Sequence, residues 1–138
     1  MRHLLILLSL LFLVLSCSEA PNLVLFSPES FAFSMEDGWE VNASVNAKGF
    51  AQIEKDNSDL YYHNINYSVN LFTPEDSIFN ADYDSIIDST SEEILDVQVE
   101  SQIQLDSGFK PGQYKLEFIV VDGYSQTKDT LSTIFVLE

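Results

Sequence analysis

Cysteine, arginine and histidine are nearly absent from this chain of 138 residues. The sequence holds one cysteine, Cys17, one arginine, Arg2, and two histidines, His3 and His63. A single thiol cannot close an intrachain disulfide, and a cysteine–histidine metal centre needs several such ligands. No Gly-x-Ser-x-Gly segment accompanies His63, so a Ser-His-Asp triad lacks its usual nucleophile motif. These absences argue against zinc, thiol and serine-hydrolase chemistry.

The N-terminus lacks an apolar run long enough to cross a bilayer. Arg2 and His3 precede an apolar stretch, residues 4–15, that is interrupted only by Ser9. A membrane-spanning helix needs roughly 20 apolar residues, whereas a charged start before a run of about a dozen is typical of a secretory signal peptide. We therefore predict a signal peptide at residues 1–16, followed by a modified cysteine and linker at residues 17–22.

The predicted signal peptide ends in the motif Val14-Leu15-Ser16-Cys17. This motif resembles the bacterial lipobox: an aliphatic residue, a variable residue, a small residue and then the cysteine. The resemblance implies that the Cys17 thiol carries diacylglycerol, that a lipoprotein peptidase cuts before it, and that the new amino group is acylated. Exported cysteines are usually paired, so lipidation also explains why an exported chain keeps one thiol.

The resemblance to bacterial lipoproteins implies a location at the outer membrane. Glu19, just after the cysteine, resembles the export signal of Bacteroidota surface lipoproteins. The periplasmic leaflet and the cell surface both remain open as locations. Three acyl chains exceed the two membrane signals that stable anchoring requires.

Basic residues are scarce in the predicted mature chain. Without residues 1–16 it has five lysines and 22 acids, a formal net charge of 5 − 22 = −17. Phosphate backbones are bound by clustered lysine and arginine, so we expect no nucleic-acid partner. The same charge holds the protein body away from an anionic membrane surface, so that the lipid and linker alone tether it.

Helical periodicity is absent, and apolar and polar side chains alternate with a period of two instead. The clearest alternation runs through residues 39–47, 60–71, 97–105 and 113–121. Further strands are expected at residues 23–35, where Pro28 indicates an edge strand with a break, and at residues 130–137, whose dense apolar side chains predict burial on both faces. Residues 77–95 show no regular pattern, so we expect a long loop or crossover there, with room for one short strand or helical turn.

About six to eight strands without helices predict an all-β fold, a single antiparallel two-sheet sandwich of immunoglobulin-like type at residues 23–138. The segment Lys110 to Gly123 is expected to form its central strand. Within it, Tyr114 lies two residues after Gly112, which resembles the tyrosine corner of immunoglobulin-like sandwiches, where the phenol bonds to the backbone upstream. The last third of the chain also resembles fibronectin III-like modules.

Candidate binding residues are few. Asp82, Asp84 and Asp88 lie in an acidic segment that could offer oxygens to Ca²⁺, with Asp56, Asp59 and Asp122 as secondary candidates. The alternative is a solvated acidic loop without metal. Tyr61 and Tyr62 could form a stacking platform for sugar or peptide, or straddle the two faces of one strand. His63 is expected at the surface or at a strand edge.

These features predict a lipid-anchored accessory or binding subunit, without enzymatic activity, that meets a protein partner at the bacterial outer membrane. No firm metal ligand or catalytic residue is expected, and the covalent lipid on Cys17 is the one expected modification. The first alternative is a carbohydrate- or calcium-dependent adhesive module. The second is a small hydrolase, which would have to use His63, the only histidine after residue 16.

Overall fold

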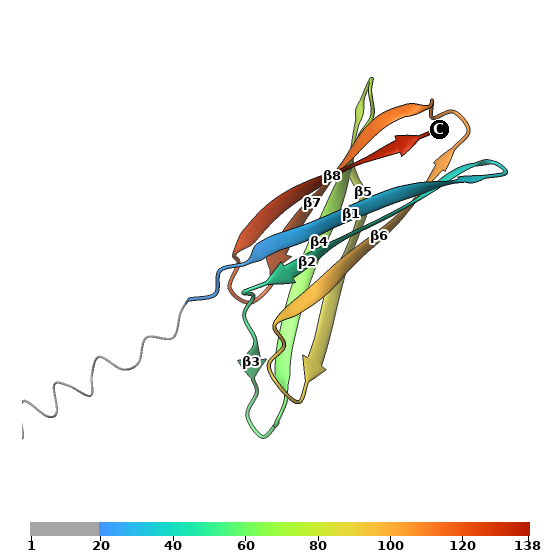
Figure 1. The fold of residues 1–138 in the computed structure, drawn as a ribbon. Helices are drawn as coiled ribbons and strands as arrows, with labels where there is room; N and C mark the ends of the chain where they lie inside the picture. The colour runs from blue at the N-terminus through green and yellow to red at the C-terminus, as the bar shows by residue number, and fades with distance from the viewer. Residues whose placement is uncertain (1–19) are drawn as a thin grey trace, which may run out of the picture.

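The computed structural model describes residues 20–138, which form two antiparallel β-sheets packed into a sandwich (Figure 1). This confirms the predicted all-β, immunoglobulin-like fold. The strands of the described residues are β1 (Val24–Met35), β2 (Gly38–Lys48), β3 (Ile53–Glu54), β4 (Tyr61–Phe72), β5 (Ser77–Thr90), β6 (Asp96–Asp106), β7 (Gly112–Asp122) and β8 (Lys128–Leu137). The predicted signal peptide and Cys17 lie outside the described residues.

The two sheets differ in size. The smaller sheet has the order β1-β2-β6, and the larger one follows the path β3-β4-β7-β8, with β5 also paired to β4. Tyr61 and Tyr62 of β4 pair with both β3 and β5, so β3 and β5 lie on opposite edges of β4. The segment predicted to be central, β7, indeed lies between β4 and β8.

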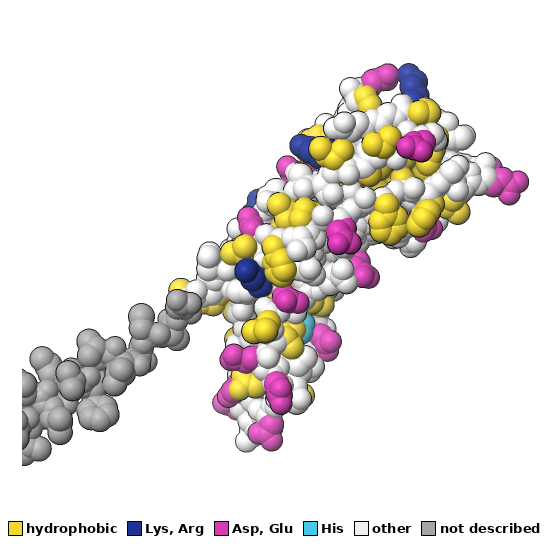
Figure 2. All heavy atoms as spheres, viewed as in Figure 1, with side chains coloured by type: hydrophobic (Ala, Val, Ile, Leu, Met, Phe, Trp, Pro, Cys, Tyr) yellow, Lys and Arg dark blue, Asp and Glu magenta, His cyan; other side chains and the backbone are white. Residues whose placement is uncertain are grey.

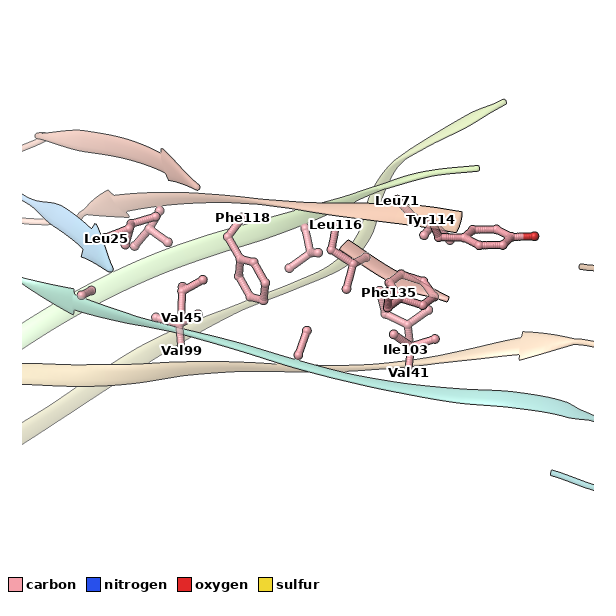
Figure 3. Packing of buried hydrophobic residues seen from close by; sticks show 14 of the residues in the cluster. Leu25, Val41, Val45, Leu71, Val99, Ile103, Tyr114, Leu116, Phe118 and Phe135 are labelled. Carbon is pink, nitrogen blue, oxygen red and sulfur yellow. The ribbon is translucent and has the colours of Figure 1, made fainter. Parts of the chain in front are cut away.

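Alternation within the strands builds the core between the sheets (Figure 3). Val41 and Val45 of β2 and Val99 of β6 point inward from the smaller sheet, and Leu116 and Phe118 of β7 point inward from the larger one. All five are almost fully buried. Each contributes about 1.5–3 kcal/mol by leaving water, so these inward rows are the main source of stability.

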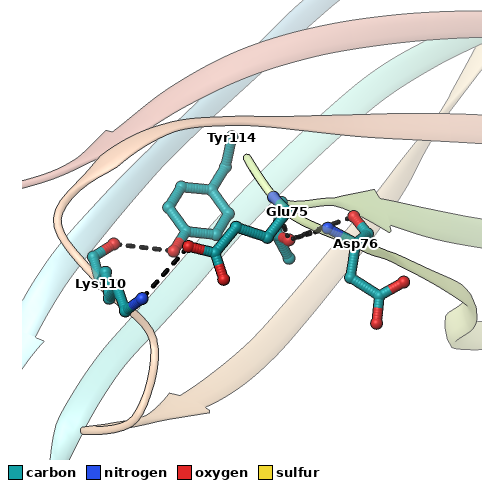
Figure 4. Close-up of polar contacts among 5 residues, drawn as sticks. Glu75, Asp76, Lys110 and Tyr114 are labelled. Atoms are coloured by element: carbon teal, nitrogen blue, oxygen red, sulfur yellow. Dashed lines mark hydrogen bonds and ion pairs between the residues drawn. The ribbon is translucent and has the colours of Figure 1, made fainter.

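A tyrosine corner closes one end of the core, as predicted (Figure 4). The Tyr114 hydroxyl donates a hydrogen bond of 2.7 Å to the Lys110 carbonyl oxygen, four residues upstream. The ring is buried and stacks on Phe135 of β8, with 5.4 Å between ring centroids. Tyr114 therefore fixes the turn between β6 and β7 while it fills the core.

We expect Tyr114→Phe to lower the free energy of unfolding by about 1–2 kcal/mol, because the ring stays but the Lys110 carbonyl loses its partner. The exposed neighbour Gln113 lies on the opposite face of β7, so Gln113→Ala should cost less than about 0.5 kcal/mol. Chemical denaturation of both variants measures the difference. Equal losses would show that the hydroxyl contributes nothing beyond the packing of the ring.

The first strand is an edge strand with a break near Pro28, as predicted. Its pairing with β2 shifts register between Phe26 and Glu29, and Ser27 has a φ of 49°. Proline has no N–H to donate to a ladder, so the shift places it where none is needed. Leu23, just before β1, is buried, and the preceding Asn22 donates its N–H to the Gly49 carbonyl at 2.9 Å.

The prediction of a loop at residues 77–95 was wrong, because most of this segment is the 14-residue strand β5. It is an edge strand that is largely exposed on both faces, so nothing demands that apolar and polar residues alternate along it. A bulge further hides the pattern: three residues, 79–81, stand opposite Asn70 of β4. Asn80 has a φ of 53°, and its N–H bonds to the Asn70 side chain at 3.0 Å.

The prediction that the last strand is buried on both faces was also wrong. Phe135 and Leu137 of β8 are buried in the core, whereas Ile134 and Val136 between them are exposed. The strand pairs with β7 alone in the described residues, and no layer covers the outer face of this sheet. The high density of apolar residues in this segment thus predicted a strand correctly, but it did not predict which faces of the strand are buried.

Candidate functional site

Exposed apolar side chains gather at one end of the sandwich. They include Phe31, Phe33 and Met35, which point outward from β1, and Ile134 and Val136, which point outward from β8. Phe33 remains 55% exposed, although its ring packs edge-on against Phe31 at 5.1 Å. Figure 2 shows hydrophobic side chains collected at this end, where the β1–β2 hairpin and the C-terminus of β8 lie.

The apolar surface continues across the outer face of the larger sheet. Phe79 of β5 packs edge-on against Phe72 of β4, with 6.4 Å between ring centroids. Phe72 pairs with Lys115, whose ammonium lies 4.0 Å from the Phe72 ring centroid, and Lys115 pairs with Ile134. We call this surface the distal band. It consists of Phe31, Phe33, Met35, Phe72, Phe79, Ile134 and Val136.

A groove of about 530 Å³ joins the two halves of the distal band. It runs between β1 and β8 and is lined by Phe31, Ile134 and Val136, with Trp39 also in its wall. The hydroxyl of Ser30 crosses it to contact Thr133 Oγ1 at 2.8 Å and the Ile134 carbonyl at 3.1 Å. The distal band is therefore one continuous surface of aromatic and aliphatic side chains.

A small apolar pocket of about 330 Å³ lies at the same end, between the β4–β5 and β6–β7 turns. Ile78, Phe109 and Tyr114 line it. Across its mouth the Lys110 ammonium pairs with Glu75 at 3.1 Å (Figure 4). Both side chains of this ion pair are well exposed, so it contributes little stability and leaves the pocket accessible.

Tyr61 and Tyr62 do not form a joint platform. They are consecutive residues of β4 and point to opposite faces of the sheet. Both are half-buried, and the Lys55 ammonium covers the Tyr62 ring at 4.0 Å from its centroid. The structure therefore supports the alternative in which the pair straddles one strand.

Asp82, Asp84 and Asp88 lie along β5 and share its inward face, because they pair with Val69, Tyr67 and His63 of β4. Neighbours on one face of a strand are about 7 Å apart, and residues four positions apart about 13 Å. Ca²⁺ needs its oxygens at about 2.3–2.6 Å, so the three do not converge on one ion. Within residues 20–138 no cluster of three acidic, histidine or cysteine side chains could hold a metal.

Asp122, a secondary calcium candidate, is instead a buried structural acceptor at the end of β7. Its Oδ2 accepts hydrogen bonds from the Ala51 N–H at 2.6 Å and from the Ser125 hydroxyl at 2.5 Å. Its Oδ1 accepts one from the Tyr124 N–H at 2.9 Å. These donors occupy both oxygens, which ties two loops to the strand. Asp59, by contrast, is exposed in the loop before β4, as is Asp56.

The expectation of a surface or edge position for His63 was wrong, because the side chain is only 2% exposed. It packs beside Phe50, with 5.7 Å between ring centroids, and its Nδ1 has no hydrogen-bond partner among the described residues. The alternation in the sequence already indicates this burial, because His63 lies two residues before the buried Ile65 and therefore on the same face of β4. Among the described residues no hydrogen bond joins this imidazole to a hydroxyl group.

Comparison with protein-family models and with curated proteins finds no match to this chain. Among residues 20–138 no helix is long and apolar enough to cross a membrane. The distal band was missed at the sequence level, because its members come from β1, β4, β5 and β8 and only the pairing of strands unites them. It is the candidate functional site.

Proposed function

We propose that this protein is a lipid-anchored, non-enzymatic binding subunit of a bacterial outer-membrane assembly, and that the distal band is its docking surface. The observation that carries this proposal is the band itself. Contiguous exposed apolar surface on a soluble domain marks interaction sites, and aromatic side chains such as Phe31 and Phe33 are enriched at the energetic centres of interfaces.

The placement of the distal band suits an anchored subunit. The chain enters the fold at Leu23, and Figure 1 shows that the β1–β2 hairpin and the end of β8 lie at the other end of the sandwich. Lipid on Cys17 would hold the entry end close to the membrane through a short linker. The band would then face away from the membrane, toward a protein that stands beside the anchor.

The negative charge of this chain indicates what kind of partner surface the distal band would bind. The chain has 22 acids against six basic residues, and Glu36 and Asp37 stand at the tip of the β1–β2 hairpin, next to Met35. An apolar partner surface rimmed by lysine and arginine would match this end, because complementary rims speed encounter and exclude like-charged partners. We therefore expect a protein partner of this kind rather than a second copy of the acidic chain.

The test is a pair of variants in the full-length protein. We expect Phe31→Ser with Phe33→Ser to reduce co-purification with the membrane partner at least tenfold, since each buried aromatic anchor is worth about 1–2 kcal/mol or more in an interface. Leu95→Ser is the matched control, because Leu95 is 89% exposed and lies outside the band. Co-purification that falls equally in both variants, or in neither, would overturn the proposal.

A carbohydrate-binding function is the second candidate, supported by the outer face of the smaller sheet. There Asn42 of β2 and Gln98 and Gln102 of β6 line a hollow of about 610 Å³ together with Phe31. Amides beside an aromatic ring suit sugar hydroxyls and ring faces. A glycan-array signal that disappears in Asn42→Ala and persists in Leu95→Ser would favour this function over protein docking.

A further inference from the structure

The edge strand β5 offers a second interaction surface, separate from the distal band. From Asp82 to Thr90 its pairing with β4 is regular, and no strand among residues 20–138 pairs with its other edge. An unpaired edge presents N–H and C=O groups that can accept one more strand. In this stretch the N–H groups of Ser85 and Ser89 donate to the neighbouring carboxylates of Asp84 and Asp88, each at 2.7 Å, so a bound strand would replace these two local bonds. The regular stretch is long enough for a stable ladder of nine residues.

The two faces of this edge differ in chemistry. The outward row contains Tyr83 and Ile87, which are 73% and 68% exposed and lie opposite Ser68 and Asn64 of β4. The inward row contains Asp82, Asp84 and Asp88, with the half-buried Ile86 between the last two. An added strand would therefore meet apolar groups on one face and mainly carboxylates on the other.

The inward row opens into an acidic mouth between β5 and β6. The Ser101 hydroxyl of β6 donates to Asp82 across it at 2.6 Å, and Tyr67, Asp82 and Glu100 line the hollow that begins here. Burial, together with the charges of Asp82, Asp84 and Glu100, raises the pKa of Tyr67. The strands β1 and β8 lie side by side at the opposite side of the sandwich, whereas β5 and β6 approach each other only locally.

We propose that the edge of β5 from Asp82 to Thr90 binds an extended segment of a partner protein in which lysine or arginine alternates with apolar residues. The basic side chains enter the mouth and pair with Asp82, Asp84 and Asp88, while the apolar ones cover Tyr83 and Ile87. Directly opposed opposite charges stabilise a strand pair. The main-chain ladder adds binding that does not depend on side chains.

The same acidic row disfavours self-association. Two copies paired through β5 would bring the row Asp82, Asp84 and Asp88 of one chain against the same row of the other, and like charges directly opposite are destabilising. Inward-pointing charges on an edge strand are a known protection against such pairing. The edge therefore disfavours an acidic strand and favours a basic one.

The probe is a synthetic peptide of alternating lysine and valine, blocked at both ends and of the same length as the regular stretch. With the full-length protein in detergent micelles, we expect amide NMR shifts confined to residues 82–90 and the β4 residues beside them. A peptide of equal composition with its lysines and valines in two blocks should bind at least tenfold more weakly. N-methylation of every second peptide amide should weaken binding by at least tenfold as well, because it removes ladder hydrogen bonds of about 1 kcal/mol each.

Matched variants test the charges. Asp84→Asn with Asp88→Asn should weaken binding of the alternating peptide about fivefold, since two charge pairs of about 0.5 kcal/mol each are lost. Asp56→Asn with Asp59→Asn removes the same charge from the exposed loop before β4 and should leave the affinity unchanged. The proposal is overturned if the alternating peptide does not bind, or if the block or N-methylated peptide binds equally well. It is also overturned if the two double variants have equal effects, if the NMR shifts fall elsewhere, or if the wild-type protein dimerises through β5. None of these results depends on Phe31 or Phe33, so a failure of this proposal can be distinguished from a failure of the proposal for the distal band.

Discussion

Asp122→Ala is expected to lower the free energy of unfolding by about 3–5 kcal/mol, a loss comparable to breaking a buried ion pair. The carboxylate is 0% exposed, and it accepts the N–H groups of Ala51 and Tyr124 and the hydroxyl of Ser125. Removing the acceptor leaves the N–H groups of the half-buried Ala51 and Tyr124 without this partner, while the Ser125 hydroxyl keeps its contact with Thr127 Oγ1 at 2.8 Å. Each such donor costs about 1–3 kcal/mol.

The loss should be large because Asp122 connects distant segments. Ala51 lies 71 positions before it and follows β2, whereas Ser125 belongs to the turn between β7 and β8. The β7–β8 turn is closed by further bonds, including that from the Asp122 N–H to the Thr127 carbonyl at 2.9 Å. Without the carboxylate, the loop after β2 is no longer held against the end of β7.

Denaturant unfolding followed by circular dichroism measures the effect of Asp122→Ala. Asp59→Ala is the matched control, because Asp59 is exposed and a surface change there should cost less than about 0.5 kcal/mol. Asp122→Asn should fall between the two, since one amide oxygen still accepts while the NH₂ group meets a donor. If the two alanine variants unfold at the same denaturant concentration, the carboxylate does not anchor the loops.

Cys17→Ala is expected to abolish membrane anchoring. Cys17 is the only thiol in the chain and lies two residues after the apolar run ends at Leu15, so no other residue can take the thioether-linked lipid. The lipid chains would each add about 0.8 kcal/mol per buried CH₂. Without them, an acidic body with five lysines has nothing that holds it to an anionic surface.

Metabolic acyl labelling and mass spectrometry of the N-terminus test this expectation. The wild-type chain should begin at a lipid-modified Cys17, whereas Cys17→Ala should carry no label and keep residues 1–16. Ser18→Ala is the control, since it changes the neighbouring residue and leaves the thiol in place. A wild-type N-terminus at another residue, without lipid on Cys17, would contradict the anchor and with it the orientation of the distal band.

Several parts of the fold were determined by the sequence alone. Alternation is a local property of a strand, so the inward row of β7, including Leu116 and Phe118, was readable without a structure. The tyrosine corner was equally local, because Tyr114 bonds only four residues back. The break at Pro28 follows from its missing N–H. These features depend on backbone chemistry within a few residues.

The tertiary structure decided what depends on neighbours far along the chain. Asp122 reads as a turn residue before Gly123, and only folding brings Ala51 to it and buries it. β5 was hidden because an edge strand that is exposed on both faces is under no pressure to alternate. The distal band exists only because pairing sets Phe72, Lys115 and Ile134 side by side. Strand pairing is a long-range choice, so a surface built across several strands cannot be read from any one of them.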